Sequence, residues 1–199
     1  MNLQEKIEKY LNEDSSKYKK GDFGYWWTVE EGNEDIEGEV VSNSIKCSNK
    51  NLTSLKGCPK VVNGNFDCYN NFLTSLDNGP EKVSGDFWCS DNDLLSLKNG
   101  PKEVGGYYYC SHNKLTSLKG APKEIRRSFS CIGNKLISLE GSPKKVGDDF
   151  DCSDNKLTSI KGCPREIGED FICIKNNISD YNIDHEPRKI GERIIREKH

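Results

Sequence analysis

No stretch of this 199-residue chain stays apolar for long. A membrane-spanning helix needs roughly 20 consecutive apolar residues. The N-terminal sequence MNLQEKIEKY also lacks the apolar segment of a secretory signal. We therefore expect the protein to stay in the cytoplasm where it is made, and we expect no membrane partner.

Charge of one sign is also scarce. Lysine and arginine number 29 against 32 aspartates and glutamates, which gives a net charge of −3. This balance produces no broad positive field for nucleic-acid phosphates, so nucleic acid is not an expected partner. Charged residues make up 31% of the chain and hydrophobic residues 33%, proportions that predict one folded domain with a thin core.

The motifs of common catalytic sites are missing too. The sequence has no glycine-rich phosphate loop, no G-x-S-x-G and no H-E-x-x-H. Its three histidines, His112, His185 and His199, are widely separated, and no two cysteines have the C-x-x-C spacing of a metal site. We expect no enzymatic activity, no metal and no cofactor.

Cysteine, by contrast, is abundant and regularly spaced. Seven of the nine cysteines recur every 21 residues. They are Cys47, Cys68, Cys89, Cys110, Cys131, Cys152 and Cys173. Neither zinc nor disulfide chemistry requires single cysteines at one fixed interval. We interpret them as reduced thiols that act as small apolar groups in a narrow interior.

Other residue types keep the same period, so one repeat reads F-x-C-x-x-N-x-L-x-x-L-x-G-x-P-x-x-V-x-G-x. The aromatic column is Phe66, Phe87, Tyr108, Phe129, Phe150 and Phe171, and the asparagine column is Asn71, Asn92, Asn113, Asn134, Asn155 and Asn176. The first leucine column runs from Leu52 to Ile178, the second from Leu55 to Ile160, and the proline column from Pro59 to Pro164.

The columns predict how each repeat folds. In F-x-C the aromatic and the thiol alternate with outward residues, as in a short strand, and stacked repeats pair these strands in a parallel sheet. The asparagine amide can satisfy backbone groups where the chain turns. Two residues before each proline stand Gly57, Asn78, Asn99, Gly120, Gly141 and Gly162. Glycine and asparagine interchange where φ is positive, so we predict a left-handed turn there.

The segment F-x-C-x-x-N-x-L resembles the strand of leucine-rich repeats over residues 45–178. The 21-residue length resembles the short bacterial class. Stretches such as CSDNKLTSIKGCP and NISDYNID are similar to repeat proteins of large tailed bacteriophages. The resemblance implies a β-rich solenoid, a leucine-rich-repeat superhelix with a parallel sheet on one face and turns on the others. It also implies a phage or bacterial origin and a binding role.

The two ends depart from the repeat, as capping segments of a solenoid do. We expect an α/β N-terminal cap over residues 1–43, made of a helix at 2–12 and a β-hairpin that places Tyr25, Trp26 and Trp27 on the first coil. The solenoid of about seven coils spans 44–178. Residues 179–199 form a C-terminal cap and tail, in which Pro187 comes two residues later than the repeat predicts.

The repeated columns build the core, so recognition should depend on outward residues that vary between coils. Neighbouring coils place four aromatic residues together on the outer sheet face: Tyr69, Trp88, Tyr107 and Tyr109. Polar residues surround them, namely Asp67, Asp86, Asp91 and His112. Exposed aromatic residues with a polar rim are typical of protein-binding hot spots, although single aromatics also favour strands by propensity alone.

Two charged features leave alternatives open. Asp149, Asp151 and Asp170 form a secondary acidic patch that either receives a basic surface or keeps the sheet soluble, and a flat ladder does not suit calcium. Basic residues after each proline, such as Lys60 and Lys102, alternate with glutamates. They either bind phosphate or form a salt-bridged solvated face, and the second interpretation is favoured.

The sequence therefore predicts a non-catalytic protein-protein interaction module with an unidentified protein partner. The resemblance to phage proteins implies an inhibitor that occupies the surface of a host enzyme or defence protein in the host cytoplasm, as anti-CRISPR proteins do. The alternative is a structural, self-assembling phage component, and an enzyme is the least favoured class. We expect a monomer or a small homo-oligomer.

Overall fold

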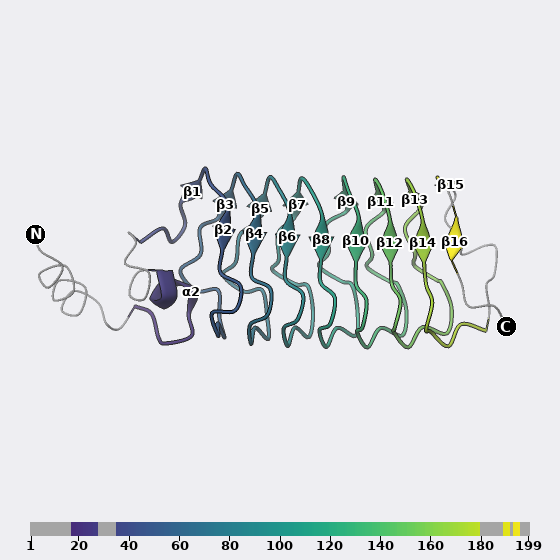
Figure 1. Cartoon of the computed structure of the whole chain (residues 1–199), viewed down its shortest axis with the longest axis horizontal. Helices are drawn as coiled ribbons and strands as arrows, with labels where there is room; N and C mark the ends of the chain where they lie inside the picture. The colour runs from purple at the N-terminus through teal and green to yellow at the C-terminus, as the bar shows by residue number, and fades with distance from the viewer. Residues whose placement is uncertain (1–16, 28–34, 180–188, 192, 196–199) are drawn as a thin grey trace, which may run out of the picture.

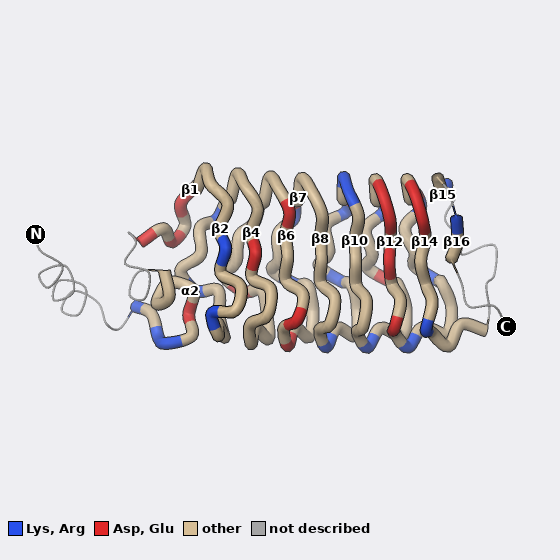
Figure 2. The backbone as a smooth tube through the Cα atoms, viewed as in Figure 1, with Lys and Arg blue, Asp and Glu red and all other residues tan. Residues whose placement is uncertain are grey.

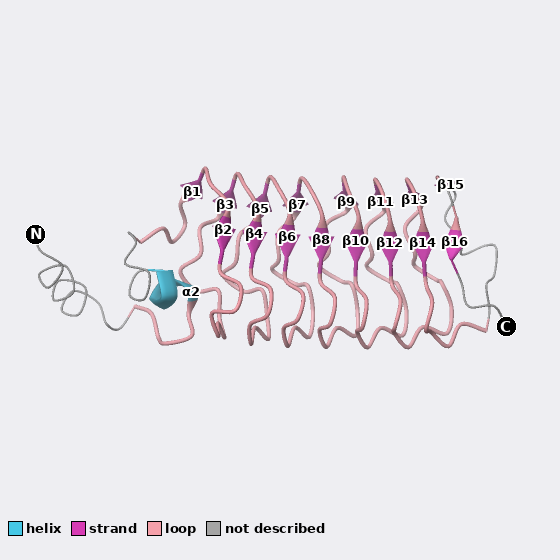
Figure 3. Cartoon of the chain, viewed as in Figure 1, coloured by secondary structure: helices cyan, strands magenta, loops and turns pink. Residues whose placement is uncertain are grey.

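The computed structural model describes residues 17–27, 35–179, 189–191 and 193–195. Within them the chain winds into an elongated stack of coils with a 21-residue period (Figure 1). Strands of two residues alternate with loops (Figure 3), and the only helix among the described residues is α2 (Phe23–Tyr25), which precedes the stack. The predicted parallel β-solenoid is confirmed.

One continuous eight-stranded sheet, which we call the main sheet, runs the length of the stack. Its strands are β2 (Ile45–Lys46), β4 (Phe66–Asp67), β6 (Phe87–Trp88), β8 (Tyr108–Tyr109), β10 (Phe129–Ser130), β12 (Phe150–Asp151), β14 (Phe171–Ile172) and β16 (Ile194–Ile195). Every pairing is parallel and joins equivalent positions of successive coils. The last pairing joins Phe171 to Ile194, two residues beyond the repeat interval, as the displaced Pro187 predicted.

A second line of strands corrects the expectation of turns on every other face. β1 (Val40–Val41), β3 (Val61–Val62), β5 (Lys82–Val83) and β7 (Glu103–Val104) form one four-stranded parallel sheet. β9 (Glu124–Ile125), β11 (Lys145–Val146), β13 (Glu166–Ile167) and β15 (Lys189–Ile190) form another. The second residue is buried in β3, β5, β7, β9, β11 and β13. It belongs to the valine column, whose side chains alternate with outward ones as in a strand.

The core is a single thin column of apolar side chains along the stack. The aromatic residues are fully buried and lie over one another, with ring centroids 5.1 to 5.9 Å apart from Phe66 to Phe171. The seven periodic cysteines are 0 or 1% exposed, as the interpretation of small apolar groups required. Burial raises the pKa of these thiols from Cys47 to Cys152, so reactive thiolates are disfavoured there.

The buried asparagines join each coil to the one before it, and this confirms their predicted role. The Oδ1 atom of Asn113 accepts a hydrogen bond from the backbone N–H of Leu94 in the preceding coil at 2.9 Å. Its Nδ2 donates to the carbonyls of Cys89, Cys110 and Ser111 at 3.0 to 3.2 Å. Equivalent contacts recur at every asparagine of the column, so a buried turn is satisfied without water.

The predicted left-handed turn before each proline is confirmed. Its six residues all have positive φ, from 60° at Asn99 to 105° at Gly120. A second left-handed position was not predicted, two residues after each cysteine. It is occupied by Asn49, Asn70, Asp91, His112, Gly133, Asp154 and Lys175. Asparagine, aspartate, histidine and glycine adopt this conformation more readily than other residues, which explains the composition of the column.

The N-terminal segment covers the first coil, but not as a hairpin. Residues 23–27 are helical, so the expected strand at Tyr25 is wrong, and β1 pairs in parallel with β3. Phe23 and Trp26 are buried against the core, and the backbone N–H of Gly24 donates to the carbonyl of Lys56 at 2.8 Å. The predicted helix at 2–12, the Gly-Asn turn and most of the C-terminal tail lie outside the described residues.

Within the part of the chain that the structure describes, no helix combines the length and the apolar character needed to cross a membrane.

Candidate partner-binding face

The outward side chains of the main sheet form one surface, which we call the outer face. They stand one residue before, one residue after and three residues after each buried aromatic residue, because side chains alternate along a strand. The surface changes character along the stack. Aromatic residues gather over β4, β6 and β8, and serines over β10. Acidic residues lie along β12 and β14 (Figure 2).

The four predicted aromatic residues lie on adjacent coils of the outer face. Trp88 pairs in register with Tyr109, and the rings of Tyr107 and Tyr109 are 5.4 Å apart. Tyr69 is 42% exposed, whereas the other three are half-buried. These four residues, which we call the aromatic cluster, therefore lie on three neighbouring coils of the outer face, and the Tyr107 and Tyr109 rings are in contact.

Two residues of the predicted polar rim form hydrogen bonds with the backbone of the outer face. The Oδ1 atom of Asp86 accepts the backbone N–H of Tyr107 at 2.9 Å, and that of Asp67 accepts the N–H of Tyr69 at 3.0 Å. Asp91 and His112 occupy the second left-handed position, and His112 is exposed there. Asp67 and Asp86 thus hold the backbone at Tyr69 and Tyr107, and His112 is the most exposed of the four rim residues.

Most of the column before the buried aromatic residue forms a ladder that sequence reasoning missed. A side-chain oxygen of each residue accepts the backbone N–H of the equivalent residue in the next coil, at 2.9 to 3.3 Å. The acceptors are Ser44, Asn65, Asp86, Ser128, Asp149 and Asp170. Tyr107 interrupts this series of short polar side chains. The restriction of the column to serine, asparagine and aspartate was the available signal.

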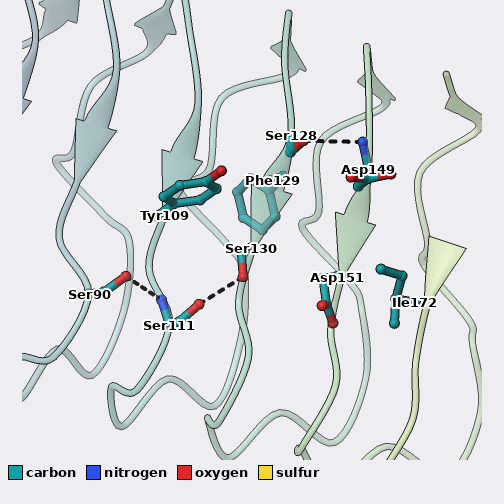
Figure 4. A pocket seen from close by; sticks show the side chains of 9 residues that line it. All are labelled: Ser90, Tyr109, Ser111, Ser128, Phe129, Ser130, Asp149, Asp151 and Ile172. Carbon is teal, nitrogen blue, oxygen red and sulfur yellow. Dashed lines mark hydrogen bonds between the residues drawn. The ribbon is translucent and has the colours of Figure 1, made fainter. Parts of the chain in front are cut away.

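A hollow of about 290 Å³ opens on the outer face beside the aromatic cluster. It is lined by Ser90, Tyr109, Ser111, Ser128, Phe129, Ser130, Asp149, Asp151 and Ile172. Figure 4 shows Tyr109 on one side and Asp151 with Ile172 on the other, with Ser130 between them. The hollow exists because three successive coils carry small hydroxyl side chains where their neighbours carry large ones. We call it the serine hollow.

The serine hollow contains an ordered polar network. The hydroxyls of Ser111 and Ser130 are 2.8 Å apart, and the Ser90 hydroxyl accepts the backbone N–H of Ser111 at 3.0 Å (Figure 4). Burial raises the pKa of Tyr109, and the neighbouring Tyr107 and Asp86 raise it further. Tyr109 is therefore a neutral hydrogen-bonding group at physiological pH.

The structure divides the predicted acidic patch. The Asp170 carboxylate pairs with the Arg193 guanidinium, whose Nη2 lies 2.9 Å from Oδ2. Asp149 and Asp151 form no ion pair among the described residues, and both line the serine hollow. Burial raises the pKa of Asp151, although the backbone N–H of Ser153 donates to its Oδ1 at 2.9 Å. The charge of the patch is thus concentrated at the hollow.

One lysine in each of the two basic columns along the coil edges has an acidic partner. Lys60 pairs with Glu81 at 3.3 Å, and Lys114 pairs with Asp93 at 2.6 Å. A second hollow of about 360 Å³ lies at the proline edge and includes Lys60 and Glu81 in its lining, so that pair already balances its charge. These contacts favour the salt-bridged face over a phosphate-binding stripe.

The candidate metal ligands lie apart in the described part of the chain, where His112 is the one histidine. There, no three histidine, cysteine or acidic side chains are grouped closely enough to hold a metal ion. His112 has no nucleophile or acid placed beside it by any contact of the described residues, and His185 and His199 lie outside them. The outer face presents an aromatic surface, hydroxyls and two carboxylates.

Comparison of the chain with protein-family models, with curated proteins and with solved structures found no match.

Proposed function

We propose that this protein is a non-catalytic binding module that contacts another protein through its outer face. The observation that carries the proposal is the aromatic cluster, in which four large side chains on adjacent coils project from a sheet held rigid by the core and the asparagine column. Tyrosine and tryptophan dominate binding energy at protein interfaces because they bury a large apolar area and retain a polar group. A rigid sheet also limits the entropy lost on binding.

The size of the outer face determines how the partner must approach. Eight strands about 4.8 Å apart give a surface roughly 35 Å long and about 10 Å wide. A standard interface takes about 800 Å² from each partner, which is more than this strip supplies. The partner therefore has to contact the coil edges as well, such as the corner at Arg127 that borders Tyr107.

Affinity capture with variants tests the proposal. Immobilised wild-type protein should retain a specific protein from a bacterial lysate, identified by mass spectrometry. Retention should fall at least about tenfold for Trp88→Ala or Tyr109→Ala, because a hot-spot side chain contributes roughly 2 kcal/mol. Tyr69→Ala is a third variant whose exposed side chain leaves the fold undisturbed.

Val40→Ala is the matched control, since Val40 is 63% exposed but lies on β1, outside the main sheet. Thermal unfolding should show that all four variants remain folded. Retention that is equal for the wild type and the three aromatic variants would contradict the assignment of the outer face.

The resemblance to phage repeat proteins supports a narrower form of the proposal, in which the partner is a host enzyme or defence protein and binding inhibits it. Purified wild-type protein should then reduce the activity of the captured partner, and Trp88→Ala should not. An unaffected partner would leave scaffolding as the role of the outer face.

Self-assembly is the alternative, because stacked coils have open ends that can pair between chains. At the N-terminal end the segment from Gly21 to Gly24 already occupies the first coil, where the N–H of Phe23 donates to the Ser54 carbonyl at 2.9 Å. This contact favours a monomer or a small oligomer. Light scattering distinguishes these from a filament, whose mass would grow with concentration.

A further inference from the structure

The serine hollow combines features that recur nowhere else on the part of the outer face that the structure describes. Tyr109 forms one wall, the serine hydroxyls line the base with Phe129, and Asp149 and Asp151 stand opposite the tyrosine (Figure 4). At about 290 Å³ it lies at the small end of the range of ligand pockets, so its size suits a single side chain better than a cofactor.

The charges around the hollow leave two carboxylates without a cation. Neighbouring acids are already paired among the described residues, Asp148 with Arg127 at 3.5 Å and Asp170 with Arg193 at 2.9 Å. The Asp149 carboxylate accepts the backbone N–H of Asp170, and the Asp151 carboxylate accepts the backbone N–H of Ser153. Two negative charges therefore face the opening, and complementarity calls for a positive group.

The protein's own arginines show how the outer face holds such a group. The Arg193 guanidinium forks onto Asp170, with Nε 3.3 Å from Oδ1 and Nη2 2.9 Å from Oδ2. The Arg127 guanidinium lies over the ring of Tyr107, 5.7 Å from its centroid, while it pairs with Asp148. The hollow repeats both elements, a tyrosine ring and aspartates, in a space that no side chain of the described residues fills.

We infer that the serine hollow receives an arginine side chain of the partner protein, with its guanidinium against the Tyr109 ring and its N–H groups directed at Asp149 and Asp151. The inference rests on the proposed function and names the chemistry that the partner presents. Arginine fits better than lysine because its planar group stacks on an aromatic ring and donates to two carboxylates at once.

The half-buried Asp151 carboxylate lowers the stability of the unbound protein, and this supports a role in binding. Its carboxylate is half-buried without a cation among the described residues, and burial raises its pKa. A buried charge that destabilises the unbound protein is compensated when a partner supplies the counter-charge.

Titration of the ¹⁵N-labelled full chain with blocked tripeptides tests the inference. The probes are Ac-Gly-Arg-Gly-NH₂, its lysine counterpart and its citrulline counterpart, which keeps the shape of arginine but has no charge. The arginine peptide should produce saturable shifts in the amide signals of Ser111, Ser130 and Ile172. The lysine peptide should bind more weakly, and the citrulline peptide should produce no saturable shift.

Two matched variants separate the hollow from general charge. Asp151→Asn keeps an Oδ1 acceptor for the Ser153 N–H, and it should weaken binding of the arginine peptide at least about fivefold. Asp154→Asn removes the same charge from the same coil at an exposed left-handed position and should change binding less than about twofold. Equal weakening by both variants, or equal binding of the arginine and citrulline peptides, would overturn the inference.

The outcome can be separated from that of the proposed function. A captured partner that is lost with Trp88→Ala but retained fully by Asp151→Asn would overturn the arginine site alone. Arginine-specific shifts, together with capture that is indifferent to Trp88→Ala and Tyr69→Ala, would overturn the aromatic cluster as the contact surface and leave the hollow, which neither residue lines, as a site.

Discussion

The two halves of the solenoid share one core but differ in their second sheet and on their outer face. The coils up to β8 carry the aromatic cluster and the sheet from β1 to β7, whereas the coils from β10 carry Ser128, Ser130, the acidic patch and the sheet from β9 to β15. Figure 1 shows the two short sheets, and Figure 2 shows the acidic residues along β12 and β14. The main sheet crosses the boundary without a break. We call the junction between the β7–β8 coil and the β9–β10 coil the seam.

The corner before the main sheet explains the seam. In the first half a glycine stands two residues before the aromatic residue, as Gly64 and Gly85 do, and in the second half it stands three residues before, as Gly147 and Gly168 do. The β9–β10 coil has Arg126 and Arg127 at these places. Among the described residues no backbone hydrogen bond joins β7 or its corner to β9, whereas Tyr108 and Cys110 still bond to the next coil at 3.1 and 2.9 Å.

Continuity of the stack therefore depends on the main sheet and the asparagine column, while the corner can change. The serine hollow lies beside the seam, lined by residues of both halves. A change in the coil thus coincides with the change in surface that makes the candidate site.

The asparagine column should contribute as much to the free energy of unfolding at the seam as in the other coils. Asn134→Ala removes the acceptor for the Leu115 N–H and the donor to three carbonyls, Cys110 among them, at 3.0 to 3.3 Å. Because these groups stay buried without partners, we expect a loss of about 3 kcal/mol in the free energy of unfolding. Urea denaturation of Asn134→Ala and Asn113→Ala checks this. A much smaller loss for Asn134→Ala would show that the seam is already open.

The corner should tolerate a side chain only at the seam. A Cβ atom at Gly168 would lie 1.6 Å from the carbonyl oxygen of Gly147 in the preceding coil, so Gly168→Ala forces the backbone apart. We expect a loss of about 2 kcal/mol. Arg126→Ala, at the equivalent position, should change the free energy of unfolding by less than about 0.5 kcal/mol. Similar losses from both changes, measured in urea, would contradict this account of the seam.

The aromatic column has one misfit next to the seam. Tyr108 is fully buried, and its hydroxyl has no hydrogen-bond partner among the described residues. Tyr108→Phe removes an unpaired buried hydroxyl and should raise the free energy of unfolding by about 1 kcal/mol. The reverse change, Phe150→Tyr in the second half, should lower it. A destabilised Tyr108→Phe would indicate that the hydroxyl has a partner in solution.

The acidic half should gain stability when Asp151 loses its charge. Burial raises the pKa of this carboxyl in the folded state. Its contribution to the free energy of unfolding is therefore fully present below the ordinary aspartate pKa and is lost as pH rises through the raised pKa. As pH increases across this window, the free energy of unfolding of the wild type should therefore decrease relative to that of Asp151→Asn. Asp67→Asn, at the same repeat position in the first half, is the control for loss of a charge. Parallel pH profiles of wild type and Asp151→Asn would refute the prediction.

The smallest effect concerns two cysteines at one repeat position. Cys58 is 3% exposed, because the N-terminal segment covers it and Gly38 donates to its carbonyl at 3.2 Å, whereas Cys163 is half-buried. Burial also raises the pKa of Cys58. A disulfide reagent should therefore modify Cys163 first and Cys58 slowly, with equal rates in denaturant. Peptide mapping of the labelled protein measures both, and prompt labelling of Cys58 would mean that the covering segment opens.

Sequence reasoning succeeded where one residue type has one local task. The left-handed turns at Gly57 and Asn78 followed from the exchange of glycine and asparagine, and the burial of Phe66 and Cys68 followed from alternation. It failed at the N-terminal segment, where β-forming residues such as Trp26 are helical because packing on the first coil outweighs propensity. The sequence also predicted a surface role for His112 but not its left-handed backbone conformation, which histidine adopts more readily than most residues.

By itself, the sequence determined the period, the inward columns and the aromatic cluster, because a repeat stacked on itself turns spacing along the chain into neighbours in space. Only the tertiary structure decided the second line of strands, the seam, the ladder that ties Asp86 to Tyr107, and the serine hollow. These features depend on how one coil lies against the next, and a hollow arises from side chains that are too small to fill the space their neighbours enclose.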